Sequence, residues 1–147
     1  MAEIITELRV NQNALDAMDA AIAEWLGVNR TDVICLDILA WLGTVTAGRL
    51  AEESRLTTIT AVIDRLERAG YVQRLADPSD RRRVLVETTE RFKELAEHAY
   101  RPVAGAISPP QRFTKEQIAG IREFLRLVAE LGYRRAEEIA AEVASRG

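Results

Sequence analysis

Cysteine and histidine are nearly absent from this sequence of 147 residues, which holds one of each, Cys35 and His98. A lone cysteine cannot form a disulfide within the chain, which fits a reducing compartment, and no second cysteine is present to resolve an oxidised sulfur. We therefore expect Cys35 to be a small core residue rather than a redox sensor. A zinc site would need carboxylates at most of its positions, so neither a metal nor a cofactor is expected.

Enzyme motifs and long apolar runs are also missing. The sequence has no glycine-rich phosphate loop, no nucleophile motif and no metal signature. Asp77 and Asp80 come nearest to an acid/base pair, but they flank a turn, and turn capping with support of an arginine accounts for them better. No apolar run approaches a membrane span, and no basic-then-apolar signal segment opens the chain. The sequence thus predicts a soluble, cytoplasmic protein that is not an enzyme and does not bind membranes.

Positive charge is scarce overall but is concentrated in one segment. The net charge is −3, and it divides into −5 for residues 1–43, +2 for residues 44–86 and 0 for residues 87–147. Only the middle segment can offer a basic patch to phosphates, while the acidic N-terminal segment disfavours unspecific association with nucleic acid.

The middle segment contains the most informative stretch, residues 57–70. At helical spacing its apolar residues fall on one stripe, while the other side begins with small hydroxyl residues and continues with arginines. Such a side can bring the backbone close to the DNA major groove. Residues 71–88 then predict a hairpin with an Asp-Pro turn and the run Arg81-Arg82-Arg83 near its tip. A helix followed by a basic hairpin is typical of a winged helix-turn-helix.

The flanking segments predict further helices. Apolar spacing favours helices over residues 6–26 and from about residue 31 to 43, the second with Val33, Leu36, Leu39, Ala40 and Trp41 pointing inward. Thr46, Thr89 and Thr114 are expected N-caps of later helices. We therefore predict a mainly α fold with a small β-hairpin wing. Its parts are an N-terminal dimerisation helix in residues 1–30, a winged core in 31–88 and C-terminal dimerisation helices in 89–147.

The stretch GRLAEESRLTTITAVIDRLERAGYVQRLADPSDRRRVLVETT resembles the DNA-binding core of the MarR family of bacterial transcription regulators, above all in DRLERAGYV and ADPSDRRR. The resemblance implies a homodimer, built by helices from both termini, that binds double-stranded DNA at a pseudo-palindromic operator. It implies a groove-facing side formed by Thr57, Thr58, Thr60, Ala61 and Arg65. In the wing it implies that Asp80 supports a minor-groove arginine, Arg82, and that Arg81 and Arg83 contact the DNA backbone.

This chain departs from the family at two positions. Thr57-Thr58 runs straight into Ile59, where family members usually have two further small residues, so either the recognition helix is shortened by half a turn or two residues are missing from the sequence. Phe92 stands where the family commonly has a glycine, which is expected to alter packing rather than function.

The family resemblance also implies a small aromatic or apolar effector between the dimerisation helices and the winged core. The candidate lining residues are Trp25, Trp41, His98 and Tyr100. The predicted function is that of a transcription repressor released by such an effector. The alternative is a winged-helix protein-interaction module that has lost sequence-specific DNA reading.

Overall fold

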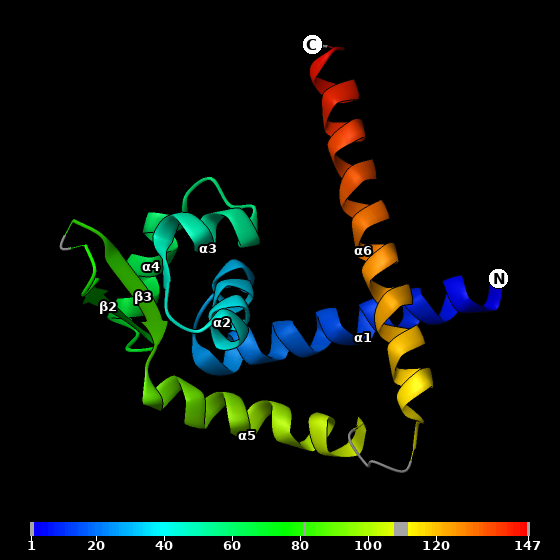
Figure 1. Ribbon diagram of the computed structural model, residues 1–147, viewed down its shortest axis with the longest axis horizontal. Coiled ribbons are helices and arrows are strands. Elements are labelled where there is room, and N and C mark those ends of the chain that lie inside the picture. The colour runs from blue at the N-terminus through cyan, green and yellow to red at the C-terminus, as the bar shows by residue number, and fades with distance from the viewer. Residues whose placement is uncertain (1, 81, 108–111, 147) are drawn as a thin grey trace. The chain divides into compact units, whose positions relative to one another are not determined.

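The computed structural model describes residues 2–80, 82–107 and 112–146, which form six helices and three short strands (Figure 1). These elements are α1 (Ala2–Leu26), α2 (Arg30–Leu42), β1 (Val45–Thr46), α3 (Ala47–Ser54), α4 (Ile59–Arg68), β2 (Val72–Ala76), β3 (Val84–Thr88), α5 (Glu90–Ile107) and α6 (Lys115–Ala144). The predicted fold class, mainly α with a small β wing, is confirmed. None of the helices in the described ranges is long and apolar enough to cross a membrane.

The chain divides into two compact units, Met1–Arg101 and Pro102–Gly147, and each is described by itself. The core of the first unit lies where α2, α3 and α4 meet the C-terminal end of α1, the sheet and the start of α5. Leu36, Leu50 and Leu66 are fully buried there, one from each of the three central helices. Burying a side chain of this size contributes about 1.5–3 kcal/mol. These contacts fix the helix-turn-helix from which the wing projects.

Cys35 and Phe92 are both part of this core. Cys35 is fully buried, as expected for a small core residue, and burial raises the pKa of its thiol to about 11. Phe92 is buried in the first turn of α5, where its ring lies 6.0 Å from that of Tyr71. Phe92 thus takes part in the packing of the core.

The C-terminal end of α2 differs from the prediction. Val33, Leu36 and Leu39 are buried as expected, but Ala40 is exposed and Trp41 is 65% exposed. At about 100° per residue, Trp41 lies about 140° around the helix from Leu36 and so points away from the buried stripe. Ala40 follows Leu36 by one turn and lies on the same side, but the core does not cover it. The prediction was wrong for both residues because apolar character does not show how much of α2 the core covers.

The predicted hairpin forms as β2 and β3, in which Val72 lies opposite Thr88 and Ala76 opposite Val84. β3 also pairs with β1, which gives a three-stranded antiparallel sheet in the order β1-β3-β2. The alternation of apolar and polar residues does not predict β1, because two residues are too few to show a period of two. Thr46 ends β1 and also caps α3, since its hydroxyl accepts a hydrogen bond from the backbone N–H of Arg49 at 3.2 Å. The sheet therefore fixes where α3 begins.

The second unit consists mainly of α6. Its start is capped as predicted: Thr114 accepts from the backbone of Gln117 at 3.2 Å, and the Gln117 side chain accepts from the Thr114 backbone at 2.8 Å. None of the described residues of α6 is buried, and its apolar stripe, which includes Ile118, Ile121 and Leu125, is exposed. α6 is thus a long helix whose apolar side is left uncovered by its own unit.

Candidate nucleic-acid interface

α4 buries one apolar stripe and presents small side chains on its other side. The buried residues are those predicted, Ile59, Val62, Ile63 and Leu66. The exposed residues at and just before its start are Thr57, Thr58, Thr60 and Ala61. The helix begins at Ile59, so Thr57 and Thr58 precede it. Thr58 has φ −116° and ψ 44°, outside the α region, and its side chain forms no capping hydrogen bond. α4 therefore begins without a side-chain cap from Thr58.

The exposed acidic residues of α4 are paired with an arginine from the neighbouring strand. Arg74 of β2 lies 2.5 Å from the carboxylate of Asp64 and also bonds to Glu67. The hydrogen bond with Asp64 is the main cause that raises the pKa of Arg74. Such partly exposed ion pairs add little stability. Their consequence is electrostatic, because the guanidinium of Arg74 neutralises one of the two carboxylate charges beside the small-residue side of α4.

Arg65, predicted to face the groove, has a partner within the chain. Its Nη2 lies 2.6 Å from Oδ1 of Asp32 in α2, and its Nε lies 3.3 Å from Oδ2. Asp32 is 1% exposed, whereas the side chain of Arg65 is 38% exposed. The hydrogen bond with Asp32 is the main cause that raises the pKa of Arg65. Spacing alone gave no signal for this pair, since its members are 33 residues apart.

Two aspartates organise the tip of the wing. Asp77 accepts hydrogen bonds from the hydroxyl and the backbone N–H of Ser79, at 2.6 and 2.8 Å, and these bonds lower the pKa of Asp77. Asp80 accepts from the backbone N–H of Arg82 at 3.0 Å, and its other oxygen lies 3.6 Å from Nε of Arg83. This geometry agrees with turn capping rather than acid/base chemistry. Asp80 thus orients Arg82 through the backbone and pairs with the guanidinium of Arg83.

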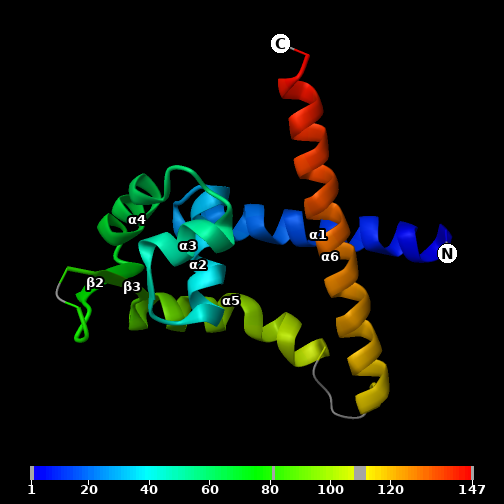
Figure 2. The same cartoon turned by 45° about the horizontal axis from the view of Figure 1, so that its top comes forward.

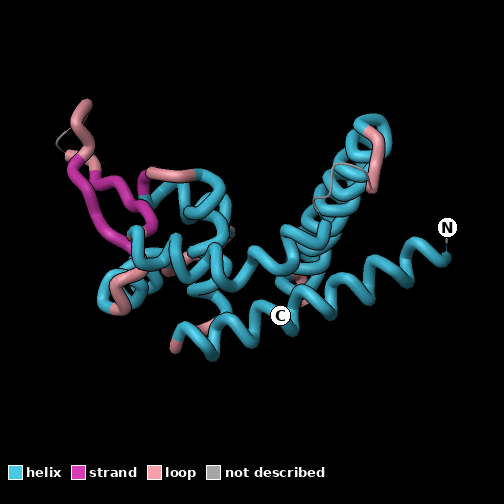
Figure 3. Tube along the Cα trace, turned by 90° about the horizontal axis from the view of Figure 1, so that it is seen from below, coloured by secondary structure: helices cyan, strands magenta, loops and turns pink. Residues whose placement is uncertain are grey.

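Arg81, the remaining wing arginine in the prediction, lies outside the described residues. The hairpin lies beside α4 (Figure 2) and extends away from the helices of the winged core, as the magenta strands in Figure 3 show. A shallow groove runs between the start of α3 and the wing. Its lining residues are Thr46, Ala47, Gly48, Arg82, Arg83 and Val84. The start of one helix and two arginines therefore share one open surface, an arrangement that suits an extended anion.

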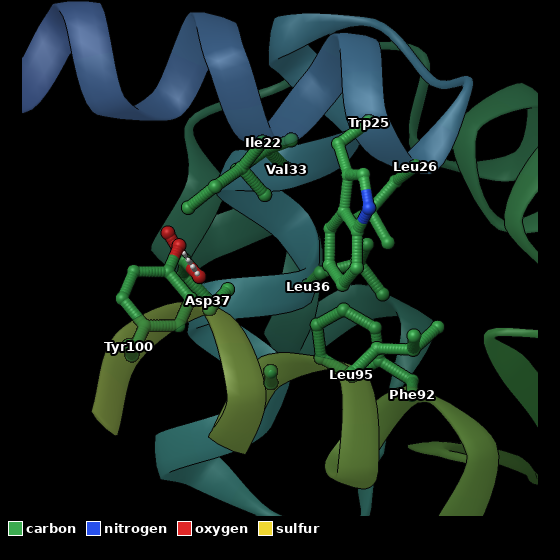
Figure 4. A pocket seen from close by; sticks show the side chains of 11 residues that line it. Ile22, Trp25, Leu26, Val33, Leu36, Asp37, Phe92, Leu95 and Tyr100 are labelled. Atoms are coloured by element: carbon green, nitrogen blue, oxygen red, sulfur yellow. Dashed lines mark hydrogen bonds between the residues drawn. The ribbon is translucent and has the colours of Figure 1, made fainter. Parts of the chain in front are cut away.

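A separate small cavity lies between α1, α2 and α5 (Figure 4). Its volume is about 10 Å³, roughly the room that one water needs. The polar groups in its lining are Asp37 and Tyr100, whose hydroxyl donates to the Asp37 carboxylate at 3.0 Å, and burial raises the pKa of both. The other lining residues are Ile22, Trp25, Leu26, Val33, Leu36, Phe92, Leu95, Ala96 and Ala99. Asp37 follows buried Val33 by one helical turn and so lies at the edge of the buried side of α2, which was the sequence signal available for it.

Three of the four predicted effector residues line this cavity or the open groove outside it. Trp25 is 52% exposed and lines both the cavity and an open outer groove, where its ring lies 5.8 Å from that of His98. Tyr100 lines the cavity. Trp41 lines neither hollow, because it points away from the buried stripe of α2. The prediction that Trp41 lines the effector site was therefore wrong.

The fold and the basic hairpin beside α4 define a winged helix-turn-helix protein. The model of the MarR family matches residues 28–84. YcgE of Bacillus subtilis (strain 168), described as an uncharacterized HTH-type transcriptional regulator, is 37% identical over 114 residues, which cover 76% of this chain and 74% of that protein. This chain belongs to the MarR family and is a transcription regulator with a DNA-binding winged helix.

Solved structures agree with this assignment of the fold. NadR in complex with 4-hydroxyphenylacetate is 25% identical and superimposes with a TM-score of 0.64, over 86% of this chain and 92% of that one. A mutant of MarR from E. coli complexed with operator DNA is 23% identical, with a TM-score of 0.52 over 86% of this chain and 95% of that one. The similarity thus extends well beyond the segment that the family model matches.

Proposed function

We propose that this regulator is a repressor that binds a pseudo-palindromic operator as a homodimer and is released by a small-molecule effector. The observation that carries the DNA-binding part is the surface formed by α4 and the wing. Small exposed side chains stand at the start of α4, the acidic side chains beside them are paired with Arg74, and Arg82 and Arg83 of the wing line an open groove with the start of α3. Small side chains let this surface approach a groove closely, and the wing arginines attract phosphates.

The proposed contacts divide between the two grooves. At the start of α4 we assign major-groove contacts to Thr57, Thr58, Thr60 and Ala61. In the wing, Arg82 enters the minor groove with its backbone held by Asp80, while Arg81 and Arg83 contact the DNA backbone. The open groove between α3 and the wing supports the backbone contacts, since helix N-termini and arginines both favour phosphate.

Uncovered apolar side chains support the homodimer. In the first unit, the N-terminal half of α1 exposes Ile4, Ile5, Val10 and Leu15. In the second unit, α6 buries none of its described side chains. Helices of this kind gain most of their stability by packing an apolar side against a partner. Two recognition helices held about 34 Å apart can then enter successive major grooves.

The proposed effector is a small aromatic or apolar molecule bound where Trp25, Tyr100 and His98 lie. The cavity of about 10 Å³ is too small for such a ligand, so binding requires its wall to move. Trp25 stands in the wall between the cavity and the outer groove, and its exposure leaves it room to turn. The complex of NadR with 4-hydroxyphenylacetate, an aromatic molecule, supports this class of effector for a related fold.

The test is a mobility-shift titration with DNA from around the chain's own gene, with unrelated DNA as competitor, at two salt concentrations. We expect a shift that resists competitor, involves two chains per site and weakens steeply with salt, because phosphate contacts release counterions. A dimer that gives no specific shift would favour the protein-interaction module instead. A monomer at micromolar concentration would overturn the homodimer.

A further inference from the structure

The ion pair between Asp32 and Arg65 joins the two helices on which DNA reading depends. Asp32 lies in the first turn of α2, where one carboxylate oxygen also accepts a hydrogen bond from the backbone N–H of Asn29 at 3.3 Å. Arg65 lies in the second half of α4 and binds both oxygens of the same carboxylate, at 2.6 and 3.3 Å. Every strong donor that Asp32 needs while buried is thus supplied by Asn29 and Arg65.

This pair differs from the ion pairs on the surface. Burying a carboxylate to 1% exposure is unfavourable unless a cation and hydrogen bonds compensate its charge. If Arg65 turned outward to a phosphate, Asp32 would keep its charge in the core without a cation. Moving Arg65 to DNA is therefore opposed by the burial of its partner.

α4 is also tied on its opposite flank. Asp64, the neighbour of Arg65 in sequence, bonds to Arg74 of β2 at 2.5 Å. An apolar stripe alone resists separation of α4 from the core but permits it to roll about its axis, because hydrophobic contact is not directional. Two directional ties from adjacent residues, one to α2 and one to β2, oppose rolling in both senses. Ala61 lies one turn before Arg65, so the roll of α4 sets where the small groove-facing side chains point.

We propose that Arg65 is a positioning residue, held by Asp32 to fix the roll of α4, and that it makes no contact with DNA. The proposal rests on the DNA-binding function proposed above. It separates Arg65 from the arginines of the wing: loss of Arg65 should weaken the preference for the operator over other DNA, while the number of phosphate contacts stays the same.

The test compares operator binding and unspecific DNA binding over a range of salt for the double variant Asp32→Asn/Arg65→Gln. This variant removes both charges of the pair and leaves no buried charge without a partner, which favours folding. We expect the ratio of operator to unspecific affinity to fall about tenfold or more, the size of a lost base contact, with the salt dependence of wild type. Arg65→Lys, which keeps the charge but loses the two-pronged geometry, should lower the same ratio.

Two single variants serve as controls. Arg68 also lies on α4, but within the described part of the chain its side chain bonds only to the backbone oxygen of Asp64 in its own helix, at 3.2 Å. Arg68→Gln should therefore leave the ratio unchanged. Arg82→Gln should flatten the salt dependence, because a guanidinium in the minor groove neutralises flanking phosphates and so displaces their counterions. All variants are compared at temperatures where thermal denaturation shows them folded.

The outcomes separate the possibilities. A double variant with a flatter salt dependence and an unchanged ratio would overturn the proposal, since that is the signature of a phosphate contact by Arg65. An unchanged ratio with unchanged salt dependence would overturn it too, because α4 would then keep its roll without the pair. Wild-type protein that binds no operator would overturn the regulator proposal itself, and this inference with it.

Discussion

Replacing Arg82 by glutamine tests how the wing contacts DNA. The guanidinium of Arg82 has no hydrogen-bond or ion-pair partner among the described residues, whereas that of Arg83 lies 3.6 Å from Asp80. Arg82 therefore presents a full positive charge to DNA, while the charge of Arg83 is partly offset. The backbone bond from Asp80 to Arg82 does not depend on the side chain, so the turn itself should survive the substitution.

The expected effect follows from these contacts. Each phosphate that an arginine neutralises contributes about 0.9 to the slope of log affinity against log salt. If the guanidinium of Arg82 in the minor groove neutralises one phosphate in each chain of the dimer, the slope should fall by about 1.8 in the variant. Loss of an arginine that reads the minor groove should cost about 1 to 3 kcal/mol, mostly at operators with A·T-rich flanks. Fluorescence anisotropy with labelled operator between about 50 and 200 mM salt covers the range in which this slope is measurable.

Arg83→Gln is the matched comparison, because it removes the same charge from the adjacent residue. Its effect on the slope should be smaller, since Asp80 already offsets that charge. Equal slopes for wild type and Arg82→Gln would refute the assignment of Arg82 to DNA. A larger effect for Arg83 than for Arg82 would refute the argument from pairing with Asp80.

Three further predictions concern the core and the cavity. Leu66→Ala should lower the free energy of unfolding by about 2–5 kcal/mol in chemical denaturation, because Leu66 is fully buried; a loss below about 1 kcal/mol would contradict its place in the core. Cys35, buried and with a thiol pKa of about 11, should react with a thiol reagent only at the rate of unfolding, and rapid labelling of native protein would contradict this. Burial raises the pKa of Asp37 in the native chain, so the stability linked to its proton is complete below about pH 4 and is lost as the pH rises through the raised value. Asp37→Asn should flatten the pH dependence of the melting temperature in that window, and an unchanged pH dependence would count against the raised pKa.

Local signals predicted much of the fold. The buried stripe of α4 depends on residues three and four apart, and caps such as that of Thr89, which accepts from the backbone of Phe92 at 3.3 Å, depend on residues three apart. The Asp77 turn is equally local, since it closes within two residues. Features of this range can be seen in the sequence because the interacting residues are neighbours in it.

The features that escaped prediction are those decided by distant residues. The pairing of Asp32 with Arg65 joins residues 33 apart, and β1 exists because β3 lies beside it. Without the fold, an arginine on the polar side of α4 cannot be assigned to DNA or to a buried carboxylate. Trp41 shows the same limit, since its apolar character does not say which side of α2 the core covers. The effector residues were only partly predicted for this reason.

The hydroxyl of Tyr71 donates to the backbone oxygen of Leu26 at 2.8 Å, across 45 positions of the chain, and so supplies a partner at the C-terminal end of α1. At a synthesis rate of about 5–20 residues per second, about 2 to 9 s pass between the addition of Leu26 and the addition of Tyr71, which supplies its partner. The C-terminal end of α1 is therefore completed by a residue at the entrance to the wing, and a nascent chain arrested before Tyr71 should fray at Leu26.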